Sequence, residues 1–583
     1  MERQTLAIRD KIKLVKTIQQ FLRESITAVS DGISFDILVP PDRKLGDYST
    51  NIAFVIAKKE GRKPFDVANE LKEKLKSGEL NSVCEIKPAP NGYLNFFLKP
   101  EFLQKQLVEI NKDDNYGAGA ERAEQKVIVE YSSPNIAKPM HIGHLRSTII
   151  GDALANVYAK LGYKVIRWNY LGDWGTQFGK LIAADKRWHG DLSAMLKDPI
   201  QEMLRLYVKF HEEEKNNPEL EKEGQEEFKK LESGDKNNII IWRAFRSASL
   251  AAFRIIFNQL GIDPNKFITK GESDYEPRLK PLIAELEKKG IAKESEGALI
   301  IDLEKYKLPP GLLRKSDGAT LYLTRDIASL EDRLQNYDSV KKILYVVANQ
   351  QTLHFEQLFA VAKELKMDSA ELVHVKFGMV LGEDGKKLAT REGKVVPLQE
   401  VINKITALAY DTVKQKNPDL SEDQAKEVAR TVGIGALKYN DLKQHPYSDI
   451  VFDWKAMLDL SGNSGPYVQY TYVRLRKLWS DSSNREEYDV SQLTHPLELE
   501  IIKKLLDFPS AISQSAERYT LNTLALYLYE LSVWASRYYE TVRILSDTSV
   551  RKQRNARLLL TETVARTIKD GLSLLGIGTL ERI

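Results

Sequence analysis

The chain has 583 residues and a net charge of +4, from 86 Lys and Arg against 82 Asp and Glu. At roughly 150 residues per domain, this length predicts three to five domains and excludes a single small binding module. The balanced charge does not by itself indicate nucleic-acid binding, so a bound polyanion must be met by local basic clusters. The single cysteine, Cys84, excludes an internal disulfide and a cysteine-based metal cluster, and it indicates a reducing compartment.

No apolar stretch reaches the roughly 20 residues of a membrane span, and residues 1–4 lack an apolar signal core. We therefore expect a soluble cytoplasmic enzyme that does not associate with a membrane. The mitochondrial matrix is the alternative compartment.

Residues 1–115 are predicted to form a small α/β domain. Residues 11–21 have helical apolar spacing. Residues 93–98 (YLNFFL) have the composition of a strand, which the turn dipeptide Asn91-Gly92 introduces. A glycine-containing linker at 116–119 separates this domain from the next.

From residue 126 the pattern becomes one of alternating strands and helices. A strand at 127–129, a loop with Pro and Gly, a helix at 145–161 and a strand at 164–168 have the order of a βαβ unit. Further strands are predicted over 298–303, 321–323, 343–347 and 373–380. We therefore expect a Rossmann-like, doubly wound parallel-sheet catalytic domain over 120–400.

Two helical regions complete the predicted organisation. An insertion of about 185–310 interrupts the catalytic domain, and its densely charged part, 212–236, is expected to be a solvated helical segment. A helical connector is predicted over 400–460. Residues 461–583 are predicted to form an all-α bundle, with helices over 521–545 and 555–575.

The sharpest motif is residues 134–144 (PNIAKPMHIGH), where the first strand-to-helix turn is expected. A helix N-terminus offers free N–H groups and a positive dipole to phosphate. Gly143 lets a flat base approach the backbone, and His141 and His144 can donate hydrogen bonds to a phosphoryl group. The alternatives are a pair of core histidines and a zinc pair, although no third zinc ligand lies nearby in the sequence.

The residues around this motif carry a family resemblance. Residues 141–144 (HIGH) resemble the first signature of class I aminoacyl-tRNA synthetases, and residues 130–147 (EYSSPNIAKPMHIGHLRS) resemble its arginyl-tRNA synthetase form. The resemblance covers nearly the whole chain in the family's order. It continues through 169–179 (NYLGDWGTQFG), 316–318 (SDG), 321–326 (LYLTRD), 350–354 (QQTLH), 378–382 (GMVLG), 465–474 (GPYVQYTYVR) and 574–577 (LLGI).

The second class I signature, KMSKS, matches residues 387–391 (KLATR) in a loop rich in Gly and Lys. The resemblance implies that Lys387 and Arg391 bind ATP. Thr390 stands where the second lysine of the signature would be, and the resemblance implies that Lys138, upstream of the HIGH motif, supplies the missing charge. The alternative for Lys138 is an ordinary surface lysine.

A pocket for arginine can be argued from Asp326. A carboxylate can receive a planar guanidinium bidentately, and Asp326 is predicted to follow a strand end and to open a helix, where parallel sheets bind ligands. The alternative is a plain helix N-cap. The resemblance implies that Asp326 and Tyr322 contact the guanidinium. It adds other polar pocket residues: Glu130, Asn135 and Gln351. His354, on the same helical face as Gln351, is expected to border the adenosine of ATP, with a partly exposed helical histidine as the alternative.

Aromatic and basic residues in the C-terminal region suit RNA. Tyr467, Tyr470 and Arg474 share one face of a predicted helix, and Arg554 belongs to a basic cluster at 551–557. Aromatic faces stack unpaired bases, and basic side chains neutralise phosphates. Aromatic residues at this spacing alternatively form a core. The resemblance makes this bundle an anticodon-binding domain, and it implies that three N-terminal residues contact the tRNA D-loop: Asn91, Tyr93 and Asn95.

The resemblance implies the activity of an ATP-dependent ligase that joins L-arginine to tRNA(Arg). Arginyl-adenylate forms first with release of pyrophosphate, and the arginyl group then passes to the 2′-hydroxyl of the terminal adenosine. His141 and His144 would stabilise the α-phosphoryl transition state, while Lys138 and Lys387 would hold the pyrophosphate. We expect Mg²⁺ on the ATP phosphates, no zinc and a monomeric protein. The rivals are another class I synthetase, cysteinyl or glutaminyl, and a catalytically silent RNA-binding paralogue.

Overall fold

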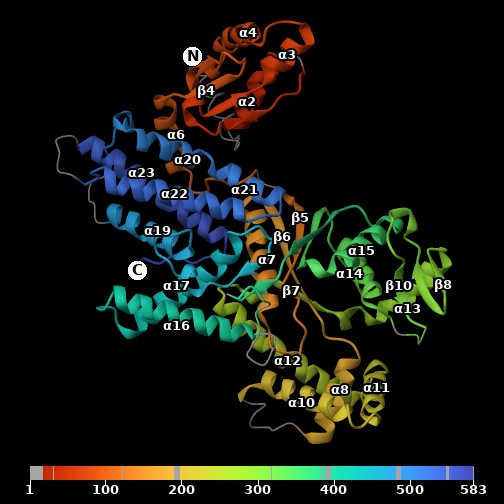
Figure 1. Ribbon diagram of the computed structural model, residues 1–583. Helices are drawn as coiled ribbons and strands as arrows, with labels where there is room; N and C mark the ends of the chain where they lie inside the picture. Colours follow the sequence, from red (N-terminus) through yellow and green to blue (C-terminus); the bar gives the residue numbers. More distant parts are fainter. Residues whose placement is uncertain are drawn as a thin grey trace.

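The computed structural model describes residues 18–30, 32–120, 122–189, 197–316, 318, 320–382, 384–386, 388, 396–480, 487–545 and 551–581. Figure 1 shows an N-terminal α/β domain, a central parallel sheet with its helices, and a helical C-terminal region. The predicted fold class is therefore confirmed. Among the residues that the structure describes, no helix combines the length and apolar composition needed to cross a membrane.

The N-terminal domain is an antiparallel sheet of order β1-β2-β4-β3 with helices packed around it. The predicted strand over 93–98 is confirmed by β4. Gly92, before β4, has a φ of 90°, and a Cβ there would lie 2.5 Å from the Cβ of Pro64, so this turn requires glycine. The elements are β1 (Ile37–Leu38), β2 (Tyr48–Thr50), β3 (Cys84–Pro88), β4 (Leu94–Leu98), α2 (Ile18–Thr27), α3 (Ile52–Glu60), α4 (Pro64–Lys76), α5 (Leu80–Val83) and α6 (Pro100–Lys112).

The central sheet is parallel throughout, with the order β12-β11-β5-β6-β7. Helix α7 (Ile142–Lys160) connects β5 to β6, which lies beside β5 in the sheet. The chain later returns to form β11, which lies along the opposite edge of β5. The carboxyl ends of β5 and β11 therefore flank a topological switch point, where sheets of this type bind ligands. The strands are β5 (Arg122–Glu130), β6 (Tyr163–Leu171), β7 (Phe267–Gly271), β11 (Val340–Ala348) and β12 (Glu371–Phe377).

Two strand predictions in this domain need correction. Residues 321–323 are not a strand, because α14 (Tyr322–Asn336) begins there and buries Leu323 and Ile327, which are four residues apart. The strand predicted over 373–380 ends at Phe377. Gly378 packs so closely against Asp449 that a Cβ would lie 2.6 Å from its Oδ1, and Val380–Leu381 form a separate strand, β13, beside β14 (Ile450–Val451).

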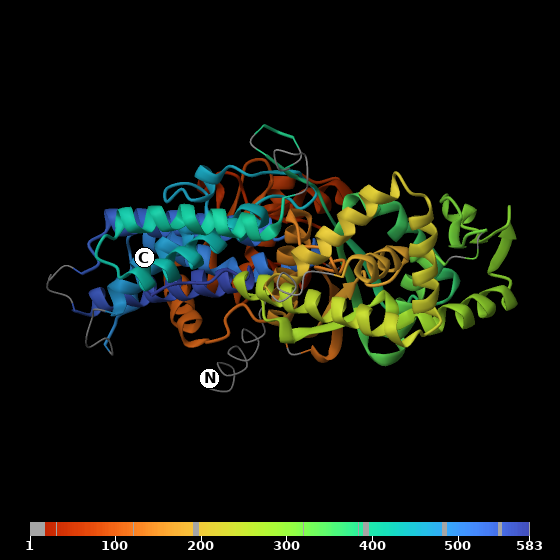
Figure 2. The same cartoon turned by 90° about the horizontal axis from the view of Figure 1, so that it is seen from below.

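The catalytic domain also contains a group of helices and strands outside the central sheet. This group contains α13 (Glu276–Lys288), α15 (Thr352–Glu364) and a small antiparallel sheet of β8 (Ala292–Ser295), β9 (Ala298–Ile301) and β10 (Gly311–Arg314). Figure 2 shows that this group and the C-terminal helices lie on opposite sides of the central sheet.

The charged insertion is helical, as predicted, but it is not solvated throughout. Its helices are α8 (Thr176–Trp188), α10 (Pro199–Glu214), α11 (Glu219–Glu232) and α12 (Lys236–Gln259). Helices α8 and α11 cross so closely that a Cβ on Gly179 would lie 2.1 Å from the carbonyl oxygen of Gly224. This crossing buries Leu220, Phe228 and Leu231 of α11.

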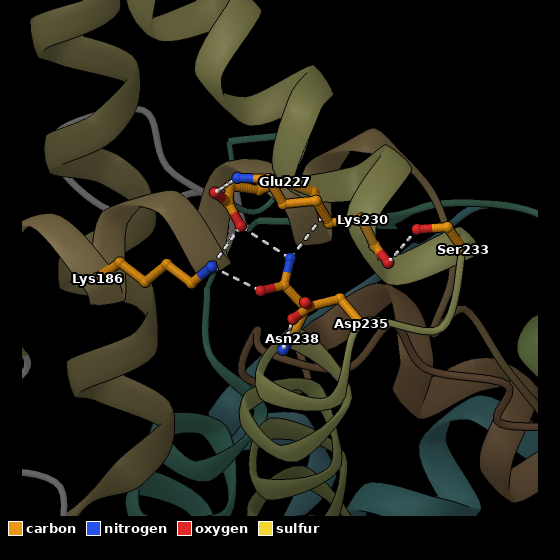
Figure 3. A network of polar contacts seen from close by, with 6 residues as sticks. All are labelled: Lys186, Glu227, Lys230, Ser233, Asp235 and Asn238. Carbon is orange, nitrogen blue, oxygen red and sulfur yellow. Dashed lines mark hydrogen bonds and ion pairs between the residues drawn. The ribbon is translucent and has the colours of Figure 1, made fainter.

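Glu227 of α11 is the centre of a buried polar network that joins three of these helices (Figure 3). Its carboxylate is 7% exposed and accepts hydrogen bonds from Lys186 at 2.5 Å, Lys230 at 2.8 Å and Asn238 at 2.8 Å. Burial opposes ionisation of Glu227, yet these bonds lower its pKa to about 2. A charge-rich sequence therefore forms a rigid, internally bonded unit here.

The C-terminal region is helical, and the predicted helices over 521–545 and 555–575 are confirmed by α22 and α23. The buried Arg146 of α7 donates to Asp441 of α17 at 2.9 Å. The buried Lys438 of α17 donates to the carbonyl oxygen of Gly576, also at short distance (2.6 Å). The helices are α16 (Leu398–Lys416), α17 (Glu422–Leu442), α18 (Trp454–Met457), α19 (Gly465–Ser480), α20 (Pro496–Leu506), α21 (Phe508–Glu517), α22 (Asn522–Thr541) and α23 (Arg551–Leu574).

Candidate active site at the switch point of the sheet

The loop between β5 and α7 has an unusual backbone that its surroundings hold in place. Ser132, Ser133 and Ala137 have φ values of 69°, 44° and 61°, which side-chain-bearing residues rarely adopt. The backbone N–H of Ser132 donates to Ser147 Oγ, and that of Ala137 donates to Ser249 Oγ, each at 2.9 Å. Strained backbone that is fixed in this way is typical of functional sites.

The two histidines of the HIGH motif lie together at the N-terminus of α7. Their ring centroids are 3.9 Å apart. His141 Nδ1 accepts from the N–H of Gly143, and His144 Nδ1 accepts from the N–H of His141, both at 3.1 Å. Because each Nδ1 is an acceptor, the neutral rings carry their protons on Nε2. Burial, together with the neighbouring His141, lowers the pKa of His144 to about 3, so His144 is a neutral donor.

The segment after the second signature is bonded to the HIGH motif. The N–H of Ile142 donates to Val396 at 3.1 Å, and the N–H of Leu398 donates to Met140 at 2.9 Å. At the other end of this loop, the N–H of Leu388 donates to Val380 at 3.0 Å. The two signatures therefore belong to one region. Lys387 and Arg391 themselves lie outside the residues that the structure describes.

Lys138 of the signature loop contacts the insertion. Its Nζ lies 4.6 Å from the ring centroid of Tyr207 in α10. Lys138 is half-buried, whereas Gly143, in the first turn of α7, is exposed. The ammonium of Lys138 therefore has an aromatic neighbour in the insertion.

Asp326 lies one turn inside α14, so the N-cap alternative is wrong; the N-cap is Leu321. Asp326 Oδ2 and His354 Nε2 are 2.5 Å apart. Burial opposes the charged imidazole, but the hydrogen bond that His354 donates to Asp326 and the charges of Asp326 and Glu130 raise the pKa of His354. The structure thus joins His354 to the carboxylate predicted to bind the guanidinium.

Glu130, at the end of β5, is buried and has an internal partner. Its carboxylate accepts a hydrogen bond from Arg333, whose guanidinium lies between the rings of Trp168 and Tyr345, at 4.7 and 5.2 Å from their centroids. Burial raises the pKa of Glu130 although Arg333 opposes this. Glu130 also interacts electrostatically with Asp326 and His354, so it belongs to the same cluster of titratable groups.

Two residues near Asp326 escaped prediction from the sequence. Glu272 is 8% exposed. Its burial and the charges of Asp326 and Asp173 raise its pKa to about 8, although Arg325 opposes this rise. The hydroxyl of Tyr170 is buried and has no partner among the described residues. Tyr170 lies within the motif at 169–179, which could have indicated it, whereas no motif contains Glu272. Clustered carboxylates of this kind suit a cationic ligand.

The other three predicted pocket residues are exposed. Tyr322 is 66% exposed and, four residues before Asp326, lies on the same side of α14. Asn135 and Gln351 are also exposed. Asn135 approaches Gly172 so closely that a Cβ on this glycine would lie 1.9 Å from Asn135 Oδ1.

Comparison with known proteins identifies the family. Three family models match the chain. Residues 13–98 match the arginyl tRNA synthetase N-terminal domain, and residues 106–454 match the catalytic domain of class I (R) tRNA synthetases. Residues 468–583 match the DALR anticodon binding domain. The chain is 41% identical over 578 residues to an arginine–tRNA ligase of Halothermothrix orenii, covering 98% of this chain and 99% of the relative. The chain belongs to the arginyl-tRNA synthetase family.

Further relatives agree over the full length. An arginine–tRNA ligase of Streptococcus uberis is 40% identical over 588 residues, covering all of both chains. The solved arginyl-tRNA synthetase of Thermus thermophilus is 26% identical, with a TM-score of 0.81 over 97% of this chain and 100% of that one. The resemblance seen in the sequence is therefore confirmed.

The residues predicted to contact tRNA in the N-terminal domain of this synthetase differ in exposure. Asn91 is exposed in the turn before β4, and the half-buried ring of Tyr93 packs against Phe54 with centroids 5.2 Å apart. Asn95 is 9% exposed, and its Oδ1 accepts a hydrogen bond from Ser49 at 2.7 Å. Asn95 therefore has an internal bond within the sheet.

The aromatic face of α19 is directed at α22. Tyr467 packs between the two helices, and its hydroxyl donates to Ser536 at 3.2 Å. The guanidinium of Arg474 lies 4.8 Å from the centroid of the Tyr470 ring and 5.0 Å from that of the Tyr539 ring. Tyr539 was not predicted from the sequence. The three predicted residues thus share one side of the helix, with Tyr467 in the packed part.

The basic cluster of α23 is only partly available to a ligand. The exposed residues are Arg551 and Lys552, whereas Arg554 is half-buried and its Nε has no partner among the described residues. Arg557 donates to the fully buried Glu498 at 2.8 Å. Arg557 is therefore part of the bundle's internal structure.

Proposed function

We propose that this synthetase ligates L-arginine to tRNA(Arg) through an arginyl-adenylate formed from ATP. The observation that carries the proposal is the cluster of Asp326, Glu130 and Glu272, in a chain related to arginine–tRNA ligases over its full length. The arginine carboxylate attacks the α-phosphorus of ATP, and pyrophosphate leaves.

His141 and His144 stabilise the α-phosphoryl transition state by donating hydrogen bonds from Nε2, while the first turn of α7 at Gly143 supports the nucleotide. Lys138 and Lys387 bind the leaving pyrophosphate, Arg391 binds ATP, and Mg²⁺ accompanies ATP as part of that substrate. The enzyme's contribution is positioning and charge stabilisation, without a covalent enzyme intermediate.

Arginine is selected by its charge and shape. Asp326 and Tyr322 receive the guanidinium, with Glu130, Asn135 and Gln351 as further polar groups of the pocket. The buried acids near Asp326 favour a cation over a neutral side chain of the same shape. His354, bonded to Asp326, borders the adenosine of ATP in this proposal.

The tRNA spans the chain. Asn91, Tyr93 and Asn95 contact the D-loop, residues 400–460 contact the stem, and the bundle over 461–583 binds the anticodon through Tyr467, Tyr470, Arg474 and Arg554. The arginyl group then passes to the 2′-hydroxyl of the terminal adenosine. We propose a monomer that acts in the cytoplasm, in keeping with a single, buried cysteine.

The test is to charge total tRNA with each radiolabelled amino acid in turn. Arginine alone should be incorporated. Incorporation of a different amino acid would show another class I synthetase, and incorporation of none would show a silent paralogue. An Asp368→Asn variant serves as a control because Asp368 is exposed at the amino end of β12, the opposite edge of the sheet from the site.

A further inference from the structure

The insertion has no part in the proposed function, yet it contacts the signature loop at two points. Ser249 of α12 is fully buried and accepts a hydrogen bond from the N–H of Ala137. Tyr207 of α10 lies under the ammonium of Lys138, at 4.6 Å from its centroid. Both contacts fall on the two residues immediately after the buried Ile136, where the backbone turns into the left-handed region.

The ring of Tyr207 is held from several directions. Its helix buries Met203, Leu206 and Phe210 against the rest of the insertion. His211 contacts the Tyr207 ring edge-on, with centroids 4.3 Å apart, and its Nδ1 lies 2.9 Å from Glu214. Glu214 in turn accepts from Lys180 of α8 at 2.6 Å, so the ring belongs to a bonded framework and not to an isolated surface helix.

The framework is joined by internal hydrogen bonds. The network around Glu227 joins α8, α11 and α12 (Figure 3). A lysine has four rotatable side-chain bonds and loses much entropy when it is fixed on a phosphate. The negative face of an aromatic ring attracts an ammonium within about 6 Å, and this attraction restricts where the ammonium can lie.

We propose that Tyr207 is a positioning residue that holds the Lys138 ammonium at the ATP site, so that the charged insertion serves phosphate binding. The proposal rests on the proposed role of Lys138 in binding the ATP phosphates. Tyr207 does not touch substrate. It acts through Lys138, and its loss should weaken ATP binding while arginine binding is unchanged.

The experiment measures arginine- and tRNA-dependent ATP–pyrophosphate exchange. Tyr207→Leu keeps an apolar side chain but removes the π face, and we expect KM for ATP to rise about three- to tenfold, with KM for arginine within twofold of the wild type. Tyr207→Phe keeps the ring and should restore wild-type KM for ATP. Equal effects of Leu and Phe, or a fall in KM for ATP, would overturn the proposal.

Lys209→Gln is a matched control on the same helix. Lys209 lies 4.4 Å from the Trp188 centroid, so this variant removes a contact of the same kind that does not involve Lys138. It should leave KM for ATP unchanged. A rise like that of Tyr207→Leu would show that α10 acts only through its general packing.

A double variant separates positioning from structure. Lys138→Gln alone should raise KM for ATP, and adding Tyr207→Leu should then change it no further, because coupled residues are not additive. A full further rise in the double variant, or an unchanged KM in Lys138→Gln, would overturn the positioning role. If Lys138→Gln leaves KM for ATP unchanged, arginylation of tRNA by the wild type would still support the proposed function.

Fluorinated phenylalanine analogues at position 207 keep the proposal testable if Tyr207→Leu unfolds. Successive ring fluorines weaken the negative face with little change of shape, so KM for ATP should climb with their number. A flat series in a protein with wild-type thermal stability would contradict the role of the ring.

Discussion

Asp326 Oδ2 and His354 Nε2 share a 2.5 Å hydrogen bond that joins α14 to α15 beside the switch point of the sheet. The imidazole thus bonds the same carboxylate that the proposed function assigns to the arginine guanidinium. Two other titratable groups face His354. Glu130 of β5 favours the imidazolium. His374 of β12 is hydrogen-bonded to Val347, and burial lowers its pKa to about 4.

This relationship predicts a pH dependence of arginine affinity. The pKa of His354 is raised in the free enzyme. A bound guanidinium repels the imidazolium, so arginine binding should release a proton, and KM for arginine should fall as the pH rises through the raised pKa of His354. Calorimetric titration in two buffers of different ionisation enthalpy counts the protons. His354→Gln should remove the linkage; an identical proton count in this variant would contradict it.

Replacing Asp326 should strongly impair arginine activation. Asp326→Ala leaves the substrate cation without its partner, at a cost of about 2–5 kcal/mol, or roughly 30- to several-thousand-fold in kcat/KM for arginine. ATP binding, measured by equilibrium dialysis, should survive because Asp326 is assigned no contact with ATP. Normal arginine-dependent exchange in this variant would disprove the assignment of Asp326.

The ion pair of Arg146 and Asp441 should be a strong stability determinant, since both side chains are almost fully buried. Arg146→Met leaves a buried carboxylate unpaired, and we expect the free energy of unfolding to fall by about 3–5 kcal/mol. Urea denaturation followed by circular dichroism measures this loss. The double variant Arg146→Met/Asp441→Leu should recover part of it, and a double variant less stable than the single one would refute this account.

The stacked arrangement of Tyr470, Arg474 and Tyr539 predicts a local loss of tRNA affinity. Because an aromatic ring can stack on an unpaired base, Tyr470→Leu should weaken tRNA binding by about 1–3 kcal/mol. Arginine and ATP binding should be unchanged. Tyr470→Phe is the matched control and should bind nearly as the wild type. Filter binding at several salt concentrations also tests Arg554→Gln, which should lower the salt slope by about one. Unaltered tRNA binding in both Tyr470→Leu and Arg554→Gln would show that these residues do not contact the tRNA.

Much of the fold could be predicted because apolar runs and turn residues act locally. The strand at 127–129 and the helix at 145–161 appear as β5 and α7. The error at 321–323 has a local cause as well. LYL is apolar enough for a strand, and only the packing of Leu323 and Ile327 on one face shows that the segment is helical.

The site could be predicted only where a motif carries it. His141 and His144 are neighbours in sequence, so their geometry follows from one helix N-terminus. The bond between Asp326 and His354, 28 positions apart, depends on how α14 and α15 pack. The burial of Glu227 depends in the same way on three helices meeting, which a charged composition conceals.

The bond from Lys438 to Gly576 also bears on how the chain folds as it is made. These residues are 138 positions apart, and synthesis at about 5–20 residues per second separates their emergence from the ribosome by roughly 7–28 seconds. Throughout that interval the carbonyl acceptor of the Lys438 ammonium does not yet exist, so α17 cannot form its final contact with the C-terminal bundle until the segment that contains Gly576 has been translated.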